Sequence, residues 1–477
     1  MAAVQFVTSM PVTATRAERH AAGKDLRSKT PRTSHGAWAA AADRPDPIRL
    51  LEQSNRTRVP ELVPIRYGRM SLSPFTFLRG AAIIMASDLA DTPISGLRMQ
   101  ICGDAHLSNY GGFATPERIL DFDVNDFDET LPGPWEWDIK RLAASIVVAG
   151  RQNAYTAQDN HQAVVDSIRE YQTSMRSLAQ MGRLDVWYQH IDLEEILGIV
   201  KGKELKRIRK QEHKAAHHTS EGVFPKLAEV VDGHYQIKDE PPLIVHVAEQ
   251  APIKTKHNGK AKGAATITAQ DEHEQIKGAL AAYSATLPEA CRQLLSKYRF
   301  VDVARKVVGV GSVGTRCWVA LFMAGGDGDD PLFLQIKEAD ASTLERYLGA
   351  SANANHGERV VQGQRLMQEA SDIFLGWTHV NVDLYVRQLR DMKWSVDIET
   401  MTRHEFEQYT RLCAMALARA HARTGDPAMI SGYLGSNDIF AEAIALFAEA
   451  YADQTERDHA ALLAAIKDGR VQAEVDV

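Results

Sequence analysis

Residues 103–129 hold the side chains whose types and spacing could do chemistry in this chain. Asp104 lies five residues before Asn109, and five carboxylates follow between Asp121 and Glu129. A carboxylate can orient and deprotonate a hydroxyl group, and Mg²⁺ accepts amide and carboxylate oxygens as ligands. This order suits phosphoryl transfer. We therefore expect Asp104 to act as a base and Asn109 as a catalytic-loop residue that binds metal.

Each of these segments also has a purely structural interpretation. Residues 103–109 alone could be a turn stabilised by Asx hydrogen bonds, and residues 121–129 could be a solvated acidic strand edge. The clustered carboxylates would, however, repel one another unless a cation lay among them. Because the two segments occur in this order, we favour a metal site. Its expected ligands are Asn109, Asp123, Asp126 and Asp128.

A second group of candidate residues follows about 200 residues later. The loop 309–314 has the pattern GxGxxG, made by Gly309, Gly311 and Gly314, with Ser312 between them. A strand is predicted on each side, which disfavours a dinucleotide-binding unit because that unit needs a helix after the loop. Strand, glycine loop and strand is instead the order of a loop that covers nucleotide phosphates. The structural alternative is a simple hairpin turn.

Lys337 ends the strand expected at residues 332–336 and is the candidate for contacting the α- and β-phosphates. The structural alternative is an exposed lysine at a strand end. A lysine that contacts the phosphates usually pairs with an acid on the following helix. Glu345, Glu358 and Glu369 are the candidates, and we favour Glu358.

The elements expected to position these residues give an α+β fold. Short strands at 97–101 and 119–124 would flank the first loop, and an amphipathic helix at 138–149 would follow. Further strands are expected at 301–308, 315–323, 332–336 and 384–389, with a tight turn at 325–330. Helices are expected at 16–27, 160–215, 356–371 and 402–468.

Composition limits the function classes. The chain has 477 residues, 25% of them charged, and a net charge of −7, which disfavours non-specific nucleic-acid binding. Its four cysteines lie far apart, which fits a reducing cytoplasm, and no apolar run is long enough to span a membrane. We expect no nucleic-acid or membrane partner, and the sequence leaves the oligomeric state open.

The segment 103–138 resembles the aminoglycoside phosphotransferase and choline kinase branch of the protein-kinase-like superfamily. That branch has the pattern His-Gly-Asp-x-His-x-x-Asn, and Cys102 replaces the first histidine here. The twelve-residue spacing of Asp126 and Asp138 implies that Asp126 binds metal and that Asp138 is structural. Counting forward from Asn109 instead favours Asp121 or Asp123, so the assignment within the acidic segment stays open.

Over nearly its whole length the chain also resembles a large bacterial family that carries the domain called DUF2252. Residues 77–80, 103–109, 125–129 and 135–142 carry this likeness. Two roles are open for Arg79 in the first of these motifs. It could reach the phosphates, or it could brace the catalytic loop through a salt bridge.

The kinase-like resemblance, with the glycine loop about 200 residues after the catalytic-loop segment instead of before it, implies a two-lobe kinase-like fold in circularly permuted order. We expect a flexible arm at 1–45, a catalytic-loop segment at 46–182 and a helical insertion or linker at 183–298. A nucleotide-binding β-lobe would occupy 299–395, and further helices of the helical lobe would occupy 396–477.

The expected function is transfer of a phosphoryl group from ATP, with Mg²⁺, to a hydroxyl of a small molecule. The alternatives are nucleotidyl transfer and a nucleotide-binding regulatory module without turnover.

Overall fold

The computed structural model of the protein describes residues 6–7, 10–192, 220–247, 269–325, 330–389 and 394–475. Its helices and strands confirm the mixed α and β class that the sequence predicts. The turn expected at 325–330 and the C-terminal part of the helical stretch expected at 160–215 lie mainly outside these residues.

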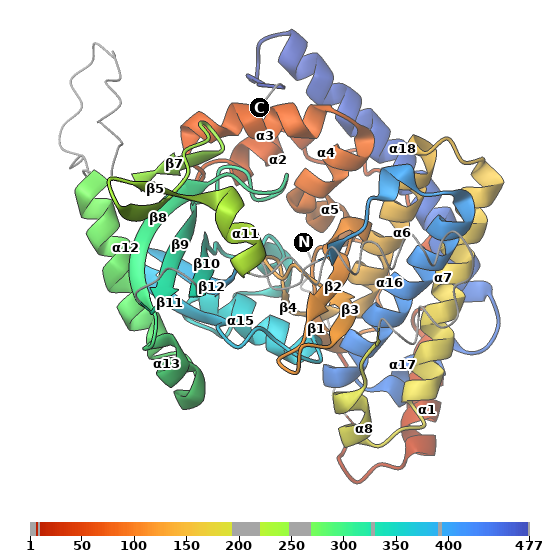
Figure 1. Ribbon diagram of the computed structural model, residues 1–477. Coiled ribbons are helices and arrows are strands. Elements are labelled where there is room, and N and C mark those ends of the chain that lie inside the picture. The colour runs from red at the N-terminus through yellow and green to blue at the C-terminus, as the bar shows by residue number, and fades with distance from the viewer. Residues whose placement is uncertain are drawn as a thin grey trace.

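A six-stranded sheet forms one half of the molecule, on the left in Figure 1. Its order is β11-β12-β10-β9-β8-β7, and all neighbouring strands are antiparallel. The central strands are buried along nearly their whole length, which explains their continuous apolar sequences. The bounds of the strands are β7 (Ile244–His246), β8 (Arg299–Lys306), β9 (Cys317–Ala324), β10 (Asp330–Glu338), β11 (Gly376–Val380) and β12 (Val382–Gln388).

Helices that precede β8 in the chain, and one that lies between β10 and β11, pack on this sheet. In α12 (Ala269–Ser284), Tyr283 joins Trp318 and Leu334 in one apolar cluster, and α13 (Glu289–Leu295) follows. Helix α15 (His356–Met367) approaches β12 so closely that a side chain at Gly357 would collide with the backbone of β12. Many buried apolar residues of the sheet form a cluster of their own, whereas Tyr385 of β12 and Val360 and Val361 of α15 belong to the core of the helical half.

The structure differs from the helical insertion or linker expected at 183–298. Its described part contains helices α8 (Arg183–Tyr188) and α11 (Ser220–Leu227), but also a two-stranded sheet of β5 (Ala228–Val231) and β6 (His234–Ile237). Strand β7 extends the six-stranded sheet by pairing with β8. A strand of three residues gives almost no periodic signal, and its partner lies more than 50 residues later.

The helical half combines helices from both ends of the chain. In Figure 1, α6 and α7 lie beside α16 and α18, and an aromatic stack joins Trp135 of α6 to Tyr171 of α7. Residues 46–182 and 396–477 thus contribute to one core. The bounds are α6 (Trp135–Gln152), α7 (Ala157–Leu178), α16 (Arg403–Thr424), α17 (Pro427–Leu434) and α18 (Ile439–Lys467).

Two small sheets and a group of short helices lie between the halves. One sheet pairs β1 (Arg98–Ile101) with β4 (Leu131–Pro134). The other has the order β13-β2-β3, from Trp394–Ser395, Tyr110–Ala114 and Leu120–Val124. The short helices are α2 (Pro47–Ser54), α3 (Val63–Ser71), α4 (Pro74–Gly80), α5 (Ala82–Leu89) and α14 (Glu345–Leu348).

The arm expected to be flexible at 1–45 is packed in its described part from residue 10 onward. Helix α1 (Arg16–Asp25) lies so close to α17 that a Cβ at Gly23 would be 1.9 Å from the carbonyl oxygen of Met429. His35 is buried and contacts the Tyr433 hydroxyl at 2.6 Å. The polar composition of this segment gave no indication of this packing, because the contacts depend on one glycine and on single side chains. Among the described helices none is long and apolar enough to cross a membrane.

Candidate functional site

The loop that follows β1 is held by Asp138, at the start of α6. The backbone N–H groups of Cys102 and Gly103 donate to its two carboxylate oxygens at 2.7 and 2.8 Å. Gly103 has a φ of +82°, a conformation that favours glycine. His421 of α16 lies 3.1 Å from the same carboxylate. Asp138 thus holds the backbone of the loop through these two hydrogen bonds, in the structural role expected for it.

Asp104 follows this turn and is surrounded by polar groups. Arg141 donates its Nε to Asp104 Oδ1 at 2.7 Å, and Asn109 donates its amide to the Asp104 carbonyl at 2.7 Å. His106 is buried, 3.7 Å from the other carboxylate oxygen. Burial raises the pKa of Asp104 to about 6, although the Arg141 charge opposes this rise. The carboxylate can therefore take up a proton close to neutral pH.

The acidic segment divides into residues that reach this loop and residues that do not. Asp123 is buried on β3 in an ion pair with Arg419, and Asp121 is buried on the same strand. The structure therefore does not bring Asp123, predicted as a metal ligand, to the cavity, because this side chain is buried beside Arg419. Asp126 and Asp128 lie beyond the end of β3 and line a cavity together with Asp104 and Asn109.

Lys337 binds an acid from this segment. Its Nζ lies 2.7 Å from Asp128 Oδ2, and the Tyr385 hydroxyl donates to Asp128 Oδ1 at 2.6 Å. Burial alone would raise the pKa of Asp128, but Lys337 and Tyr385 outweigh burial and lower it to about 2. Among the described residues Glu358 makes no ion pair with Lys337, contrary to our expectation. It lies in the first turn of α15, where Asn355 caps its backbone N–H.

The glycine loop lies against the short N-terminal helices. Arg69 donates to the Gly309 carbonyl at 2.6 Å, and Val59 N–H donates to the Gly314 carbonyl at 2.8 Å. Arg58 donates to the Val313 carbonyl between them. Gly309 and Gly314 have φ values of +64° and +89°. The loop is thus held by donors from a segment that lies some 250 residues earlier in the chain.

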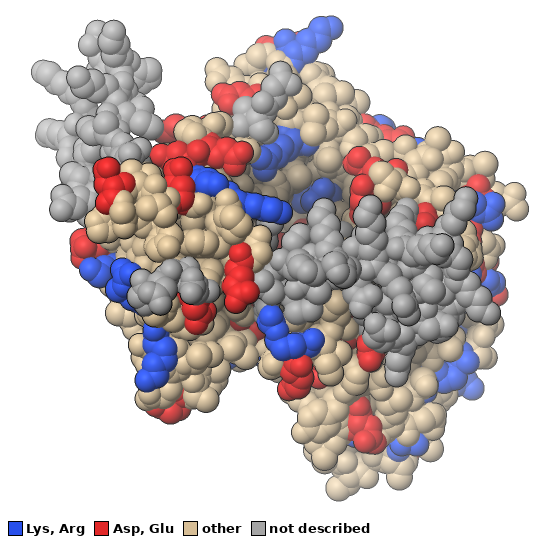
Figure 2. All heavy atoms as spheres, viewed as in Figure 1, with Lys and Arg blue, Asp and Glu red and all other residues tan. Residues whose placement is uncertain are grey.

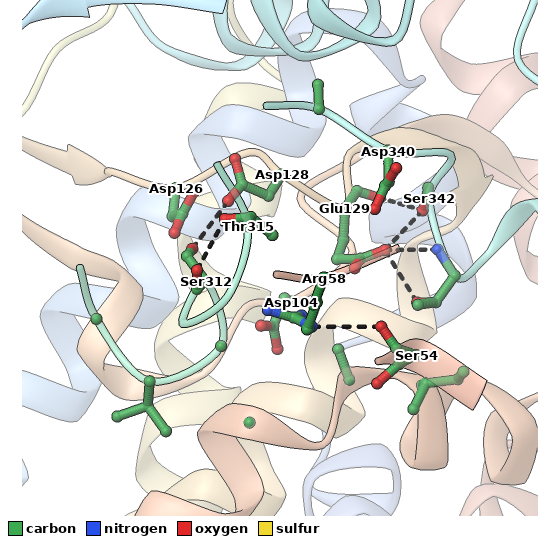
Figure 3. A pocket seen from close by; sticks show the side chains of 18 of the residues that line it. Ser54, Arg58, Asp104, Asp126, Asp128, Glu129, Ser312, Thr315, Asp340 and Ser342 are labelled. Carbon is green, nitrogen blue, oxygen red and sulfur yellow. Dashed lines mark hydrogen bonds between the residues drawn. The ribbon is translucent and has the colours of Figure 1, made fainter. Parts of the chain in front are cut away.

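One cavity of about 490 Å³ joins these parts. Gly309, Gly311 and Ser312 line it, and Ser312 donates to Asp128 at 3.3 Å, whereas Gly314 lies beside Arg58 outside the lining. Lys337 reaches the cavity only through Asp128. Figure 3 shows Asp126, Asp128 and Ser312 close together, with Asp340 and Glu129 along the same wall. Arg79 also lines the cavity, and its charge interacts with that of Asp104.

The oxygens available to a cation are few. Asp126 Oδ1 is buried and has no hydrogen-bond partner, and burial raises the pKa of this carboxyl with help from the charge of Asp128. In the described part of the chain, no three His, Cys, Asp or Glu side chains form a group that could hold a metal ion. Mg²⁺ often uses only one or two carboxylates together with substrate phosphates. Asp126, Asp128 and the Asn109 amide fit that smaller demand.

A family described as an uncharacterized protein conserved in bacteria, DUF2252, matches residues 58–465. The chain belongs to this family. The matched range includes the loop at 103–109, the acidic segment and the glycine loop, so every part of the cavity described above except its first residues, 53–57, lies within it. No curated protein and no solved structure matches the chain.

Sequence reasoning missed three features of this site. It did not assign Asp128 to Lys337, it overlooked Arg141 beside Asp104, and it gave Arg58 no role. Arg141 lies on α6 three residues after Asp138, so the helical spacing could have placed it on the same face. No local signal could have revealed Arg58, because its contact with the glycine loop is made across 255 residues.

Proposed function

We propose that the protein is an ATP- and Mg²⁺-dependent phosphotransferase that acts on a hydroxyl of a small molecule. One observation carries this proposal. The loop with Asp104 and Asn109 and the glycine loop 309–311 line the same cavity, although about 200 residues separate them. Each group has a sequence reason to bind a nucleotide or an acceptor, and a common cavity is the arrangement that transfer between them requires.

In this proposal Asp104 orients the acceptor hydroxyl and takes its proton. The hydroxyl oxygen forms a bond to the γ-phosphorus, the bond between that phosphorus and the β-phosphate oxygen breaks, and ADP leaves with the electron pair. Arg141 and Asn109 keep the carboxylate in place through the bonds at 2.7 Å to Asp104. The glycine loop would hold the phosphates in this geometry, and Lys337 would position Asp128 beside them.

Mg²⁺, when bound, would neutralise charge on the phosphates. Asp126 is the best candidate ligand, because its Oδ1 is buried without a partner. Both oxygens of Asp128 already accept a hydrogen bond, from Lys337 and from Tyr385, so Asp128 would share the ion only through a remaining lone pair, and Asn109 through its amide oxygen.

The kinase-like, circularly permuted fold is part of the same proposal. Glycine loop, β9, β10 ending near Lys337, α15 and β12 follow one another in the order expected for a nucleotide-binding lobe. The pair formed by Lys337 and Asp128 supports this arrangement, because it joins the proposed lobe to the acidic segment. All four cysteines are free, which fits the cytoplasmic location we propose.

Analysis of the products of Mg²⁺-ATP turnover tests the proposed reaction. ADP would support phosphoryl transfer, whereas pyrophosphate would replace it by nucleotidyl transfer, and absence of turnover in an acceptor screen would favour a regulatory nucleotide-binding module. Asp104→Asn should abolish turnover while nucleotide binding persists. Asp43→Asn, at an exposed position outside the cavity lining, is the matched control.

A further inference from the structure

Four arginines line the cavity without a carboxylate partner among the described residues; three of them are at least partly buried, and the fourth, Arg346 of α14, is exposed. The three partly buried arginines, Arg58, Arg66 and Arg79, come from or flank helices α2 to α4. Among the described residues none of them has a carboxylate oxygen within 4.0 Å of its guanidinium, although other buried arginines of this chain are paired, for example Arg141 with Asp104 at 2.7 Å. The cavity therefore holds positive charge that the protein itself does not neutralise by direct contact.

The hydrogen bonds of these arginines distinguish their roles. Arg66 is only 2% exposed and is used by its neighbours, since it donates to the Gly80 carbonyl at 2.8 Å and to Ser54 Oγ at 3.0 Å. Arg58 donates to the Ser54 carbonyl at 3.3 Å and to the Val313 carbonyl, and its second terminal nitrogen makes no hydrogen bond to any described residue. The Nε of Arg79 is buried and has no partner, like that of Arg66, but among the described residues the terminal nitrogens of Arg79 make no hydrogen bond either, whereas both of those of Arg66 do. Arg58 and Arg79 thus keep donor groups for a ligand.

The two carboxylates whose charges act most strongly on Arg58, those of Asp340 and Glu129, accept hydrogen bonds from other residues. Asp340 accepts a hydrogen bond from Thr57 at 2.7 Å, and Glu129 accepts from Ser342 and Thr343 at 2.7 to 3.0 Å. Burial lowers the pKa of both Arg58 and Arg79, which reflects the cost of holding these charges away from water. A buried charge without a partner is expensive, so an anion in the cavity would be favoured.

We infer that Arg58 and Arg79 form a binding site for a dianionic phosphoryl group. A guanidinium presents a planar fork of donors that matches phosphate oxygens. In Figure 2, blue Lys and Arg atoms are visible inside the hollow between the two halves of the molecule. The inference rests on the proposed function for the source of the phosphoryl group, which is either the terminal phosphate of the nucleotide or a phosphate carried by the acceptor.

Calorimetric titration with inorganic phosphate and with pyrophosphate tests the site directly. We expect Arg58→Gln and Arg79→Gln to weaken binding of these probes by about 10- to 100-fold, the loss of one or two charge-assisted hydrogen bonds. Arg56→Gln is the matched control, because Arg56 is exposed and does not line the cavity, and its binding should equal that of the wild type. Arg79→Lys keeps the charge without the fork and should give an intermediate loss. Thermal unfolding of each variant establishes that it is folded.

Nucleotides then identify the source of the phosphoryl group. If the site takes the terminal phosphate, Arg58→Gln should weaken Mg²⁺-ATP and leave Mg²⁺-ADP unchanged. If it takes a phosphate of the acceptor, both nucleotides should bind as in the wild type, and inorganic phosphate should bind to the ADP-saturated protein only when Arg58 is present.

Equal binding of phosphate and pyrophosphate by wild type, Arg58→Gln and Arg79→Gln would overturn the inference, and so would no binding to the wild type at millimolar concentration. The proposed function can fail separately. Arginine-dependent phosphate binding without any nucleotide binding would leave the anion site standing and remove the phosphotransferase. Nucleotide turnover that neither arginine variant affects would support the phosphotransferase and remove the anion site formed by Arg58 and Arg79.

Discussion

The Nζ of Lys337 lies 2.7 Å from Asp128 Oδ2, although 209 residues separate them in the chain. This pair joins the end of β10 to the acidic segment that follows β3. The lysine side chain is 3% exposed and the aspartate side chain 33% exposed. The two candidate regions recognised in the sequence are therefore in direct contact, through residues that sequence reasoning had assigned to different partners.

Replacing Lys337 by methionine should destabilise the protein. The change leaves Asp128 without its cation, which costs about 3 kcal/mol for a mostly buried pair. Urea denaturation would measure this loss, with Lys297→Met as a control at an exposed position. The double variant Lys337→Met, Asp128→Asn should regain part of the stability, and a double variant as unstable as the single one would argue against the pairing.

The rate of turnover should rise with pH through the pKa of Asp104. Burial holds that pKa at about 6, and only the ionised carboxylate can accept a proton, so kcat/KM should increase about tenfold per unit below pH 6 and level off above it. Arg141→Gln removes the charge that lowers this pKa most and should move the midpoint upward, whereas Arg141→Lys should move it less. A midpoint that stays in place in Arg141→Gln would show that another group titrates.

Asp121 should make the protein less stable as pH rises. Burial, with the neighbouring charge of Asp123, raises the pKa of Asp121 to about 7 in the folded chain. The folded state then binds the proton more tightly than the unfolded state. Stability is lost between about pH 4 and pH 7, by at most roughly 1.4 kcal/mol per pH unit. Asp121→Asn keeps an oxygen for the Ile191 N–H, which donates at 3.0 Å, and should flatten the unfolding free energy over this range. A slope equal to that of the wild type would refute the assignment.

Alanine at Gly23 should loosen the N-terminal segment. Its Cβ would lie 1.9 Å from the Met429 carbonyl, so α1 has to move away from α17, at a cost of about 1–3 kcal/mol. Gly278→Ala is the matched control, since nothing lies within 4 Å of its Cβ on the exposed side of α12, and it should stabilise by about 0.5–1 kcal/mol. Limited proteolysis of the N-terminal segment would detect the release, and an unchanged cleavage rate in Gly23→Ala would contradict the packing role.

Local patterns carried much of the sequence interpretation. The strands around the glycine loop follow from apolar runs bounded by glycine, and α6 follows from its helical periodicity. The order of Asp104, Asn109 and the acidic segment 121–129 along the chain also predicted that they meet, and Asp126 and Asp128 of that segment line one cavity with Asp104 and Asn109. These features depend on residues close together in sequence, which is why the sequence alone could predict them.

Other features depend on contacts across hundreds of residues. The choice between Asp123 and Asp126 is made by Arg419 on α16, which neutralises Asp123 in the core. The partner of Lys337 is set by how the sheet docks on the acidic segment, and the position of Arg58 is set by the glycine loop. No spacing rule within one segment contains this information.

The most direct test of the proposed nucleotide site is the thermal shift caused by ATP with and without Mg²⁺, in wild type and in Asp126→Asn. A ligand at a hundredfold excess over its dissociation constant stabilises the native state by about 2.7 kcal/mol. We predict a Mg²⁺-dependent shift in the wild type and in the exposed control Glu117→Gln, and its loss in Asp126→Asn. Absence of any shift with ATP or GTP in the wild type, or a full shift in Asp126→Asn, would contradict the account.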